Sequence, residues 1–431
     1  MIFIGLFTFL DPPKPDVEEA IRVLKEANLK IHMITGDLAS TAECLAKKLD
    51  ILSNTTENLD EENNLSAVIT GQRLATLTPL QWSNLMKKDG VVFARVSPED
   101  KQIIVRKYKE DGKKKVIMIG DGANDALALK EADVGIVLGK NCSILSQDVA
   151  DLIFKEDNFN LIVHCIEQGR IFFDNLKKTV AYTLAHCILE VVPCFLSAAI
   201  CMPLAISNLQ MLMIDFGTEM IPAISLAFLQ TKEKIMERYP RDHETDTLVS
   251  WKLLFHSYIF VGSIELFWCL FAYFINFGQN NINDNYCHVG IDDFNKELGD
   301  HHFVATHENE VWNFYCTSEQ QKMVLSQVQM AWFTTVVLGQ FANILLMVGV
   351  KNIMTLVSVG IEIILLVFMI WVPDLVKFFF LKDPRVQFKY NYPLLLTPWI
   401  GILVCLFLYY KGRKWCKRRN LRGKVTQFFN W

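Results

Sequence analysis

The sequence Gly120-Asp121-Gly122-Ala123-Asn124-Asp125 places two carboxylates and an amide around a glycine turn, directly after an apolar run. Oxygen ligands of this kind suit Mg²⁺, a hard cation that binds carboxylates together with phosphate. Asp121 and Asp125 are therefore the predicted metal ligands, with Asn124 beside them. An acidic turn that caps a helix has the same residue types, so the motif alone leaves both interpretations open.

Two further polar positions have side chains suited to a phosphoryl group. Lys101 begins a helix after the apolar run 91–96, and a lysine can steady phosphate oxygens. Thr35, in Thr35-Gly36-Asp37, can offer its hydroxyl and its backbone amide. Taken singly, Lys101 also fits a solvated helix lysine, and Thr35 a cap between a strand and a helix.

Alternating strands and helices must position these residues. A helix is predicted over 15–27, and strands over 2–10, 30–34, 91–96 and 115–120. This alternation indicates a parallel sheet with helices on both faces. Because chemistry collects at the carboxyl ends of the strands in such sheets, the three polar stretches should lie together. The polar residues 53–88 are predicted to be an insertion.

The second half of the chain is predicted to cross a membrane. Of the 431 residues 51% are hydrophobic, and the apolar runs approach the ~20 residues needed to span a bilayer. This excludes a wholly soluble or a disordered protein, and the net charge of −4 gives no support for a nucleic-acid partner. The six predicted spans are 181–202, 207–229, 252–277, 327–348, 354–373 and 391–410.

The distribution of charge predicts the orientation of these spans. Lys177 and Lys178, the segment 232–241 and the tail are basic and should be cytoplasmic, whereas the acidic loop 278–326 should be external. The basic loop 374–390 departs from this rule. The predicted domains are an incomplete α/β domain, a stalk or linker, a six-helix membrane domain and a basic tail, over residues 1–155, 156–180, 181–410 and 411–431.

Four ionisable residues lie in the first two predicted spans. His186 and Glu190 are four residues apart and so share a helix face, and Asp215 and Glu219 repeat that spacing. Ionisable groups within a span are expensive and are functional candidates by default. Three acids in one bundle can replace the hydration shell of a cation. Interhelical hydrogen bonds or ion pairs are the alternative.

Three stretches, in order, resemble the phosphorylation domain of P-type ATPases, a haloacid-dehalogenase-like (Rossmannoid) α/β fold followed by an all-α bundle of transmembrane helices. They are Met33–Asp37, Phe93–Lys101 and Ile119–Leu129, and Asp11-Pro12-Pro13 resembles the family's acidic-proline motif. Ile119 departs from the family's usual Thr. The resemblance implies Mg²⁺ and ATP as cofactors. It implies metal and phosphate roles for Asp121, Asn124 and Asp125, phosphoryl binding by Thr35 and Lys101, and nucleotide or phosphate contacts for Asp11, Gly36 and Asp37.

The membrane segments resemble the branch of sodium/potassium and proton/potassium pumps. Asn175–Leu184 and Ile214–Ala227 are similar to its fifth and sixth helices, which implies ion coordination by Glu190, Asp215 and Glu219. Gln340 and Asn343 fall on ion-site positions of the eighth helix, although both amides can also serve hydrogen bonds between helices. The resemblance further implies transport of Na⁺, K⁺ or H⁺ in a multi-pass plasma-membrane protein. A β subunit would meet loop 278–326, where Cys287 and Cys316 are either a disulfide or two free thiols.

Departures from the branch leave the transported ion open. Glu219 stands where Asp is usual, Asn343 where sodium pumps have Asp, and Cys187 and Leu189 replace an Asn and a Pro. His186 replaces a Ser of sodium pumps, at the position where proton pumps carry Lys. His186 is therefore predicted to act as a titratable cation tethered inside the transport site. The alternative is a neutral histidine that is hydrogen-bonded between helices.

The family's Asp-Lys-Thr-Gly-Thr and Thr-Gly-Glu motifs do not occur in the 431 residues. Without the phosphorylated aspartate, this chain by itself is expected to form no phosphoenzyme and to hydrolyse no ATP by the family mechanism. The prediction is thus the carboxyl-terminal part of a P-type pump. The alternatives are a catalytically dead, truncated membrane protein with an interaction or regulatory role, or a membrane-tethered phosphatase, which would need a nucleophile as well.

Overall fold

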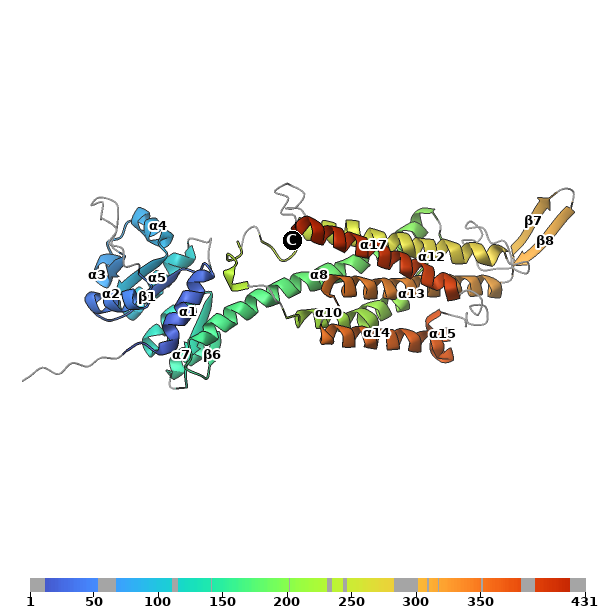
Figure 1. Cartoon of the computed structure of the whole chain (residues 1–431). Coiled ribbons are helices and arrows are strands. Elements are labelled where there is room, and N and C mark those ends of the chain that lie inside the picture. Colours follow the sequence, from blue (N-terminus) through green and yellow to red (C-terminus); the bar gives the residue numbers. More distant parts are fainter. Residues whose placement is uncertain are drawn as a thin grey trace, which may run out of the picture. The chain divides into compact units, whose positions relative to one another are not determined.

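The computed structural model of the chain divides into two compact units (Figure 1). Unit 1 contains Met1–Ile171 and Lys232–Thr247, and unit 2 contains Phe172–Thr231 and Leu248–Trp431. The structure describes residues 12–52, 67–110, 115–140, 142–200, 202–230, 235–242, 246–282, 301–307, 310–316, 318–349, 352–380 and 392–418. The predicted strand 2–10 and Asp11 lie outside these residues.

Unit 1 contains two three-stranded parallel sheets. The first has the order β1-β3-β2, with β1 at Ile31–Ile34, β3 at Gly90–Ala94 and β2 at Val68–Thr70. The second has the order β4-β5-β6, with β4 at Ile117–Ile119, β5 at Val134–Leu138 and β6 at Leu152–Phe154. Strands covered on both faces are almost continuously apolar, as β3 is. The predicted parallel α/β architecture is confirmed.

Short helices connect the strands of unit 1. They are α1 (Pro15–Glu26), α2 (Ala39–Lys48), α3 (Gly71–Leu74), α4 (Pro79–Lys87), α5 (Pro98–Glu110), η1 (Ala123–Asp125), α6 (Ala126–Glu131) and α7 (Ile144–Val149), with η3 (Ile235–Glu237) from the later segment. Thr78 and Gln81 form a capping box that fixes the start of α4.

Two predictions about unit 1 were wrong in detail. Residues 67–87 belong to the domain and not to an insertion, because β2 pairs with β3 and Trp82 of α4 is buried near Phe93. The apolar stretches of β2 and α4 are short and lie between polar turns, so their hydrophobic pattern is weak in the sequence. Strand β3 ends at Ala94 and not at Val96, since Arg95 has a φ of 52°, outside the strand region.

One side chain links the two strands that begin the second sheet. Asp133 accepts hydrogen bonds from the backbone N–H of Val116 at 2.9 Å and from Lys115 Nζ at 3.0 Å. Partial burial raises the pKa of Asp133, but these two donors outweigh it and hold the pKa below its usual value. The link fixes β4, which carries the Asp121 turn at its carboxyl end.

Unit 2 is helical. It contains most of α8 (Asn160–Ile200), then α9 (Asn208–Leu212), η2 (Met213–Glu219), α10 (Met220–Ala227), α11 (Trp251–Leu254), η4 (Phe255–Gly262), α12 (Ser263–Ile282), α13 (Ser318–Val348), α14 (Ile353–Trp371), α15 (Pro373–Phe380) and α17 (Tyr392–Arg418). Both η2 and η4 are π-helical, so α9–α10 and α11–α12 are each one helix with a wider turn inside.

Helices lie at all six predicted spans. By length and composition, four stretches among the described residues could cross a membrane: Asn160–Ile200, Trp251–Asn276, Val324–Val348 and Ile353–Trp371. The other two predicted spans correspond to α9–α10, which the π-helical segment divides, and to α17, whose end is basic. The helical character of this region is confirmed.

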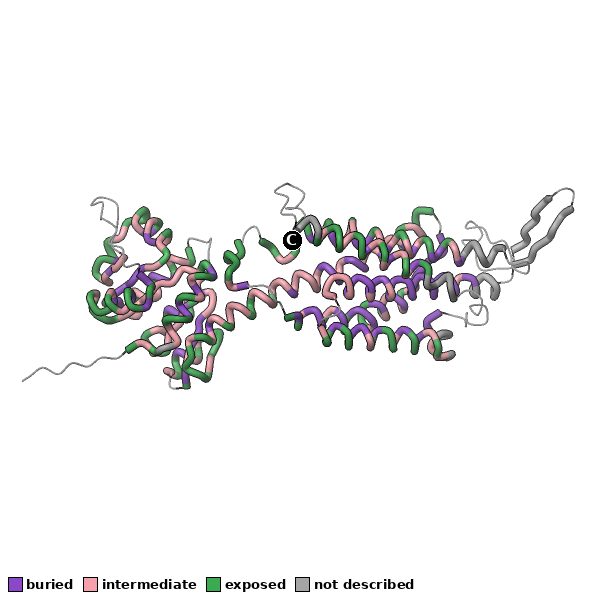
Figure 2. The backbone as a smooth tube through the Cα atoms, viewed as in Figure 1, coloured by how far each residue is buried: buried purple, intermediate pink, exposed green. Residues whose placement is uncertain are grey.

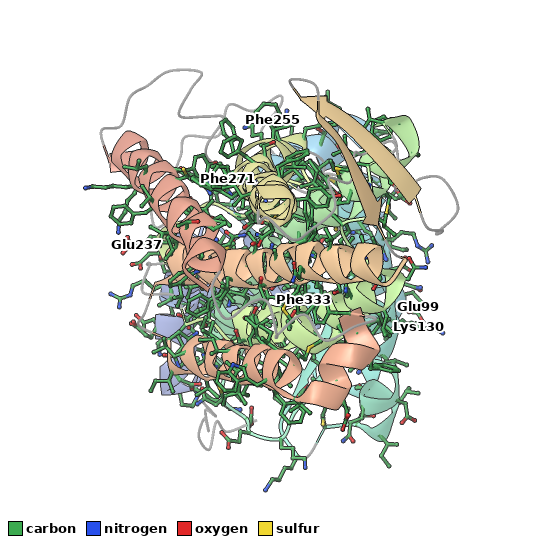
Figure 3. The ribbon with its side chains drawn as sticks, turned by 90° about the vertical axis from the view of Figure 1, so that its right-hand side faces the viewer. Glu99, Lys130, Glu237, Phe255, Phe271 and Phe333 are labelled. Carbon is green, nitrogen blue, oxygen red and sulfur yellow. The ribbon has the colours of Figure 1, made fainter. Side chains whose placement is uncertain are left out.

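The helices of unit 2 pack through three clusters of buried apolar side chains. Helices α12, α13 and α17 lie side by side, and α14 packs against α10 (Figure 1). Buried positions recur along α13 (Figure 2), where Phe333 packs edge-on against Phe380 with ring centroids 5.8 Å apart. Figure 3 labels Phe333 in one of these clusters, whereas Phe255 and Phe271 are exposed. An outer apolar face of this kind suits lipid contact.

An antiparallel hairpin lies within the segment predicted to be an external loop. Strand β7 (His301–His307) pairs with β8 (Glu310–Cys316), and His301 lies opposite Cys316. The sequence analysis did not predict these strands. Cys287 lies outside the described residues, so the disulfide stays a prediction.

Candidate functional site

The turn after β4 and the first turn of α5 meet in an ion pair. Lys101 Nζ donates to Asp125 Oδ1 at 2.6 Å, and each side chain is only 13% exposed. Asp125 ends the short helix η1, whose backbone turns back on itself through a hydrogen bond from Asp125 N–H to Gly122 C=O at 2.9 Å. The sequence analysis predicted both residues for one site, and the structure joins them directly.

Gly120 makes room for this ion pair. A Cβ atom at Gly120 would lie 2.7 Å from Asp125 Cβ and 2.8 Å from its Oδ2, closer than side-chain carbons approach. At Gly122 the nearest atom to such a Cβ would be Asp125 Oδ2 at 3.6 Å, an ordinary contact. The absence of a side chain at Gly120 therefore lets Asp125 reach Lys101.

Gly120→Ala is expected to destabilise unit 1, with Gly122→Ala as the matched control. Forcing extra atoms into a packed site typically costs about 1–3 kcal/mol, because Asp125 must move away from Lys101. Urea unfolding of the purified chain, followed by circular dichroism, measures the difference. Equal stability of the two variants would show that the close packing of Asp125 on Gly120 is not needed.

The Thr35 loop is fixed against the end of β3. Thr35 Oγ1 donates to Asp37 Oδ2 at 2.9 Å and accepts from the Asp37 backbone N–H at 3.1 Å. Its backbone bonds to the strand end, with Thr35 N–H donating to Phe93 C=O at 2.9 Å and Arg95 N–H to Asp37 C=O at 3.0 Å. Gly36 lies between them in open space. Among the described residues, no hydrogen bond joins this loop to Lys101 or Asp125.

Asp121 and Asn124 are both exposed. The Asp121 carbonyl accepts from Ser143 N–H at 3.0 Å, while its carboxylate has no hydrogen bond to any of the described residues. Asp121 borders a cavity of about 320 Å³ that is also lined by Lys140, Lys155 and Asp157. An accessible carboxylate beside the Lys101–Asp125 pair fits a Mg²⁺ ligand, because Mg²⁺ uses one or two carboxylates together with phosphate oxygens and water.

The second predicted site lies between α8 and η2. His186 Nε2 is 3.1 Å from Asp215 Oδ1, and His186 Nδ1 is 2.8 Å from Glu219 Oε1, although not in hydrogen-bond geometry. His186 and Glu219 are buried, and the Asp215 side chain is 45% exposed. Among the described residues, this is the one group of three histidine, cysteine, aspartate or glutamate side chains whose potential metal-binding atoms all lie within 4.8 Å of one another.

The segment that carries both acids is not an ordinary α-helix. Asp215 and Glu219 lie in the π-helix η2, where Thr218 Oγ1 also donates to Ile214 C=O at 3.1 Å. Single π-helical turns within α-helices are frequent at functional sites. The sequence analysis placed the two acids on one face of an α-helix. In the structure both acids face His186, as predicted, but they lie on a wider π-helical turn that residue spacing does not reveal.

The other predicted membrane residues take separate partners. Glu190 lies one turn from His186 with a buried Oε1 that has no hydrogen-bond partner. Gln340 Nε2 donates to Glu265 Oε2 at 2.9 Å, and Asn343 Oδ1 accepts from Tyr410 Oη at 2.8 Å. These amide contacts join α13 to α12 and α17. The structure thus brings together His186, Asp215 and Glu219, and not Gln340 and Asn343 with them.

Two buried acids were missed by the sequence analysis. Glu265 on α12 and Glu362 on α14 are both almost fully buried, and both carboxylate oxygens of Glu362 lack a hydrogen-bond partner. Each interrupts an apolar run, in Ser263-Ile264-Glu265 and Gly360-Ile361-Glu362. Both acids are visible in the sequence as charged residues within predicted spans, whereas the predicted ionisable ligands all lie in the first two spans.

Comparison with known proteins gives matches over both units. Residues 3–133 match the family of haloacid dehalogenase-like hydrolases, and residues 203–416 match the family described as cation transporting ATPase, C-terminus. Sodium/potassium-transporting ATPase subunit alpha-4 of Homo sapiens is 33% identical over 99% of this chain and 42% of its own length. Subunit alpha-1 of Anguilla anguilla and subunit alpha-2 of Homo sapiens are each 32% identical over 99% of the chain and 43% of their own lengths.

The chain therefore spans less than half the length of these curated relatives. The two matched families follow the order of the α/β unit and the helical unit, as the motifs predicted. The resemblance drawn from Thr35-Gly36-Asp37, Lys101 and the Asp121 turn is confirmed. By fold, family matches and relatives, the chain belongs to the P-type cation-transporting ATPases.

Proposed function

We propose that the chain is the part of an ATP-driven monovalent cation pump that carries its Mg²⁺ and phosphate residues and its membrane cation site. The observation that carries this proposal is the cluster of His186, Asp215 and Glu219 between two apolar helices. The relatives' names support Na⁺/K⁺ exchange. The resemblance of the membrane segments to the branch of sodium/potassium and proton/potassium pumps also allows H⁺/K⁺ exchange.

In this proposal the α/β domain, residues 1–155, handles phosphate. Asp121 and Asp125 would hold Mg²⁺, which supplies charge neutralisation to phosphoryl transfer when bound. Lys101 and Thr35 would hold phosphoryl oxygens, with Asn124, Gly36 and Asp37 shaping the site and Asp11 near ATP. The Lys101–Asp125 contact already fixes one donor and one acceptor side by side.

The membrane domain, residues 181–410, would bind the transported ion through Glu190, Asp215, Glu219, Gln340 and Asn343, with His186 as a tethered cation in the same site. A purely structural ion pair is the competing interpretation of the His186 cluster. The number of carboxylates in these helices argues against a purely structural ion pair, because Glu190, Glu265 and Glu362 have no salt bridge in the described part of the chain. Uncompensated buried carboxylates cost several kcal/mol each, so bound cations or protons must offset them.

The proposal extends to location and partner. Residues 156–180 would be a stalk and 411–431 a cytoplasmic tail of a multi-pass plasma-membrane protein. A β subunit would meet the segment 278–326, which contains the β7–β8 hairpin. No nucleic-acid partner is proposed.

A chimera tests the proposed function. The part of the human alpha-4 subunit outside the matched region is joined to this chain, and ATP-dependent uptake of radioactive rubidium and sodium is measured in proteoliposomes. We expect flux that Asp215→Asn lowers about tenfold or more, since a charged ligand is lost. A folded chimera that forms phosphoenzyme but moves neither ion would contradict the proposal.

A further inference from the structure

A fully buried carboxylate on α12 stands apart from the His186 cluster. Glu265 has no exposed surface, and its Oε2 accepts from Gln340 Nε2 on α13 at 2.9 Å. Its other oxygen, Oε1, is buried without a hydrogen-bond partner. Among the described residues no lysine, arginine or histidine lies within salt-bridge distance of Glu265. A proton or a cation must therefore accompany this charge.

The Gln340 side chain that faces Glu265 also has an oxygen without a partner. Gln340 Oε1 is also buried without a partner, so two acceptor oxygens on neighbouring side chains lack donors. Carboxylate and amide oxygens are the ligands of hard cations. Because a single carboxylate carries one negative charge, the pair suits a monovalent cation.

Packing holds the carboxylate against α13. Gly339, next to Gln340, has no side chain, and a Cβ there would lie 3.8 Å from Glu265 Cγ and 3.4 Å from Ile402 Cδ1 of α17. One turn along α13, Asn343 is held by Tyr410 of α17. Glu265 is thus fixed between three helices that pack against one another, as a ligand must be to select an ion.

The charge balance differs between the two places. In the His186 cluster, a protonated imidazole can offset Asp215 and Glu219 from within the protein, because its positive charge lies within salt-bridge distance of both carboxylates. Glu265 has only the neutral Gln340 as its partner. It is still close enough to His186 and Glu219 to interact with them electrostatically.

We propose that Glu265 and Gln340 form a further monovalent-cation subsite, which extends the transport site of the proposed function onto α12 and α13. A carboxylate at Glu265 then supplies the charge that His186 partly cancels in the neighbouring cluster. The inference rests on the proposed function, and the competing possibility is a neutral carboxyl–amide pair between α12 and α13.

Equilibrium binding of radioactive rubidium and sodium to the purified chain in lipid nanodiscs tests this subsite. Glu265→Gln is expected to weaken binding of one of the two ions about tenfold, which corresponds to about 1.4 kcal/mol. Glu265→Asp keeps the charge and should weaken it less. Thr335→Val on α13 is the matched control, because the Thr335 hydroxyl serves only the Ala331 carbonyl of its own helix.

If Glu265→Gln fails to fold, a variant that adds negative charge tests the proposed subsite instead. Gln340→Glu adds a second carboxylate, and we expect it to tighten cation binding. Wild-type affinity in a folded Glu265→Gln variant, or unchanged affinity in Gln340→Glu, would overturn the subsite. Weaker binding in Asp215→Asn alongside normal binding in Glu265→Gln would leave the proposed function standing and reject this inference alone. A wild-type chain that binds neither ion would reject both.

Discussion

Asp121→Asn is expected to lower Mg²⁺-dependent phosphoenzyme formation about 100-fold or more, equivalent to about 2.7 kcal/mol of barrier. The carboxylate at Asp121 is exposed and makes no hydrogen bond to any described residue, so it is open to a metal ion, whereas Asp125 is held by Lys101. Asparagine keeps the size of the side chain and removes the charge that Mg²⁺ requires. The measurement is acid-stable phosphate incorporation from labelled ATP in the chimera with the alpha-4 subunit.

Asp148→Asn is the control for this prediction, because the Asp148 side chain on α7 is exposed and makes no hydrogen bond or ion pair among the described residues. Its phosphoenzyme level should equal that of the unmodified chimera. If Asp121→Asn also forms near-normal phosphoenzyme, Asp121 is a turn residue only and the Mg²⁺ assignment is wrong.

His186 substitutions are expected to change cation affinity in opposite directions. His186→Gln removes the cationic ring that faces Asp215, Glu219 and, one turn away, Glu190, so binding of rubidium or sodium should tighten about tenfold at pH ~6. His186→Lys fixes a positive charge there and should weaken binding. The same nanodisc assay measures both variants.

The dependence on pH separates a tethered cation from a structural histidine. The imidazole is the titratable cation of this cluster, so wild-type binding should strengthen with rising pH over the range in which the ring loses its proton. His186→Gln and His186→Lys should each show a flatter profile. Parallel profiles for all three proteins would show that His186 only packs between the helices.

The sequence predicted the parts of the fold that residue order controls. Apolar runs that end in Thr35, Lys101 and Asp121 predicted parallel strands, and β1, β3 and β4 lie where those runs do. The prediction of one shared sheet edge was wrong in detail, because β4 lies in a second sheet from β1 and β3. The short strand β2 was not predicted, because its three residues, Val68–Thr70, are too few to show an alternating hydrophobic pattern between polar turns.

Partners and local geometry were harder to predict than elements. Spacing placed Asp215 and Glu219 on one helix face, but it did not reveal the π-helical turn that presents them to His186. Gln340 was predicted as an ion ligand from resemblance, yet its contact with Glu265 depends on the packing of α12 against α13. Such contacts between distant residues follow from tertiary packing and leave no periodic signal in the chain.

The central claim is that a monovalent cation binds at the cluster of His186, Asp215 and Glu219. Equilibrium binding of radioactive sodium and rubidium to the purified chain in nanodiscs tests it most directly, with Asp215→Asn/Glu219→Gln as the comparison and Thr335→Val as the control. The account predicts saturable binding of at least one ion in wild type and Thr335→Val, and its loss in the double variant. Saturable binding that is unchanged when both carboxylates are neutralised would contradict it.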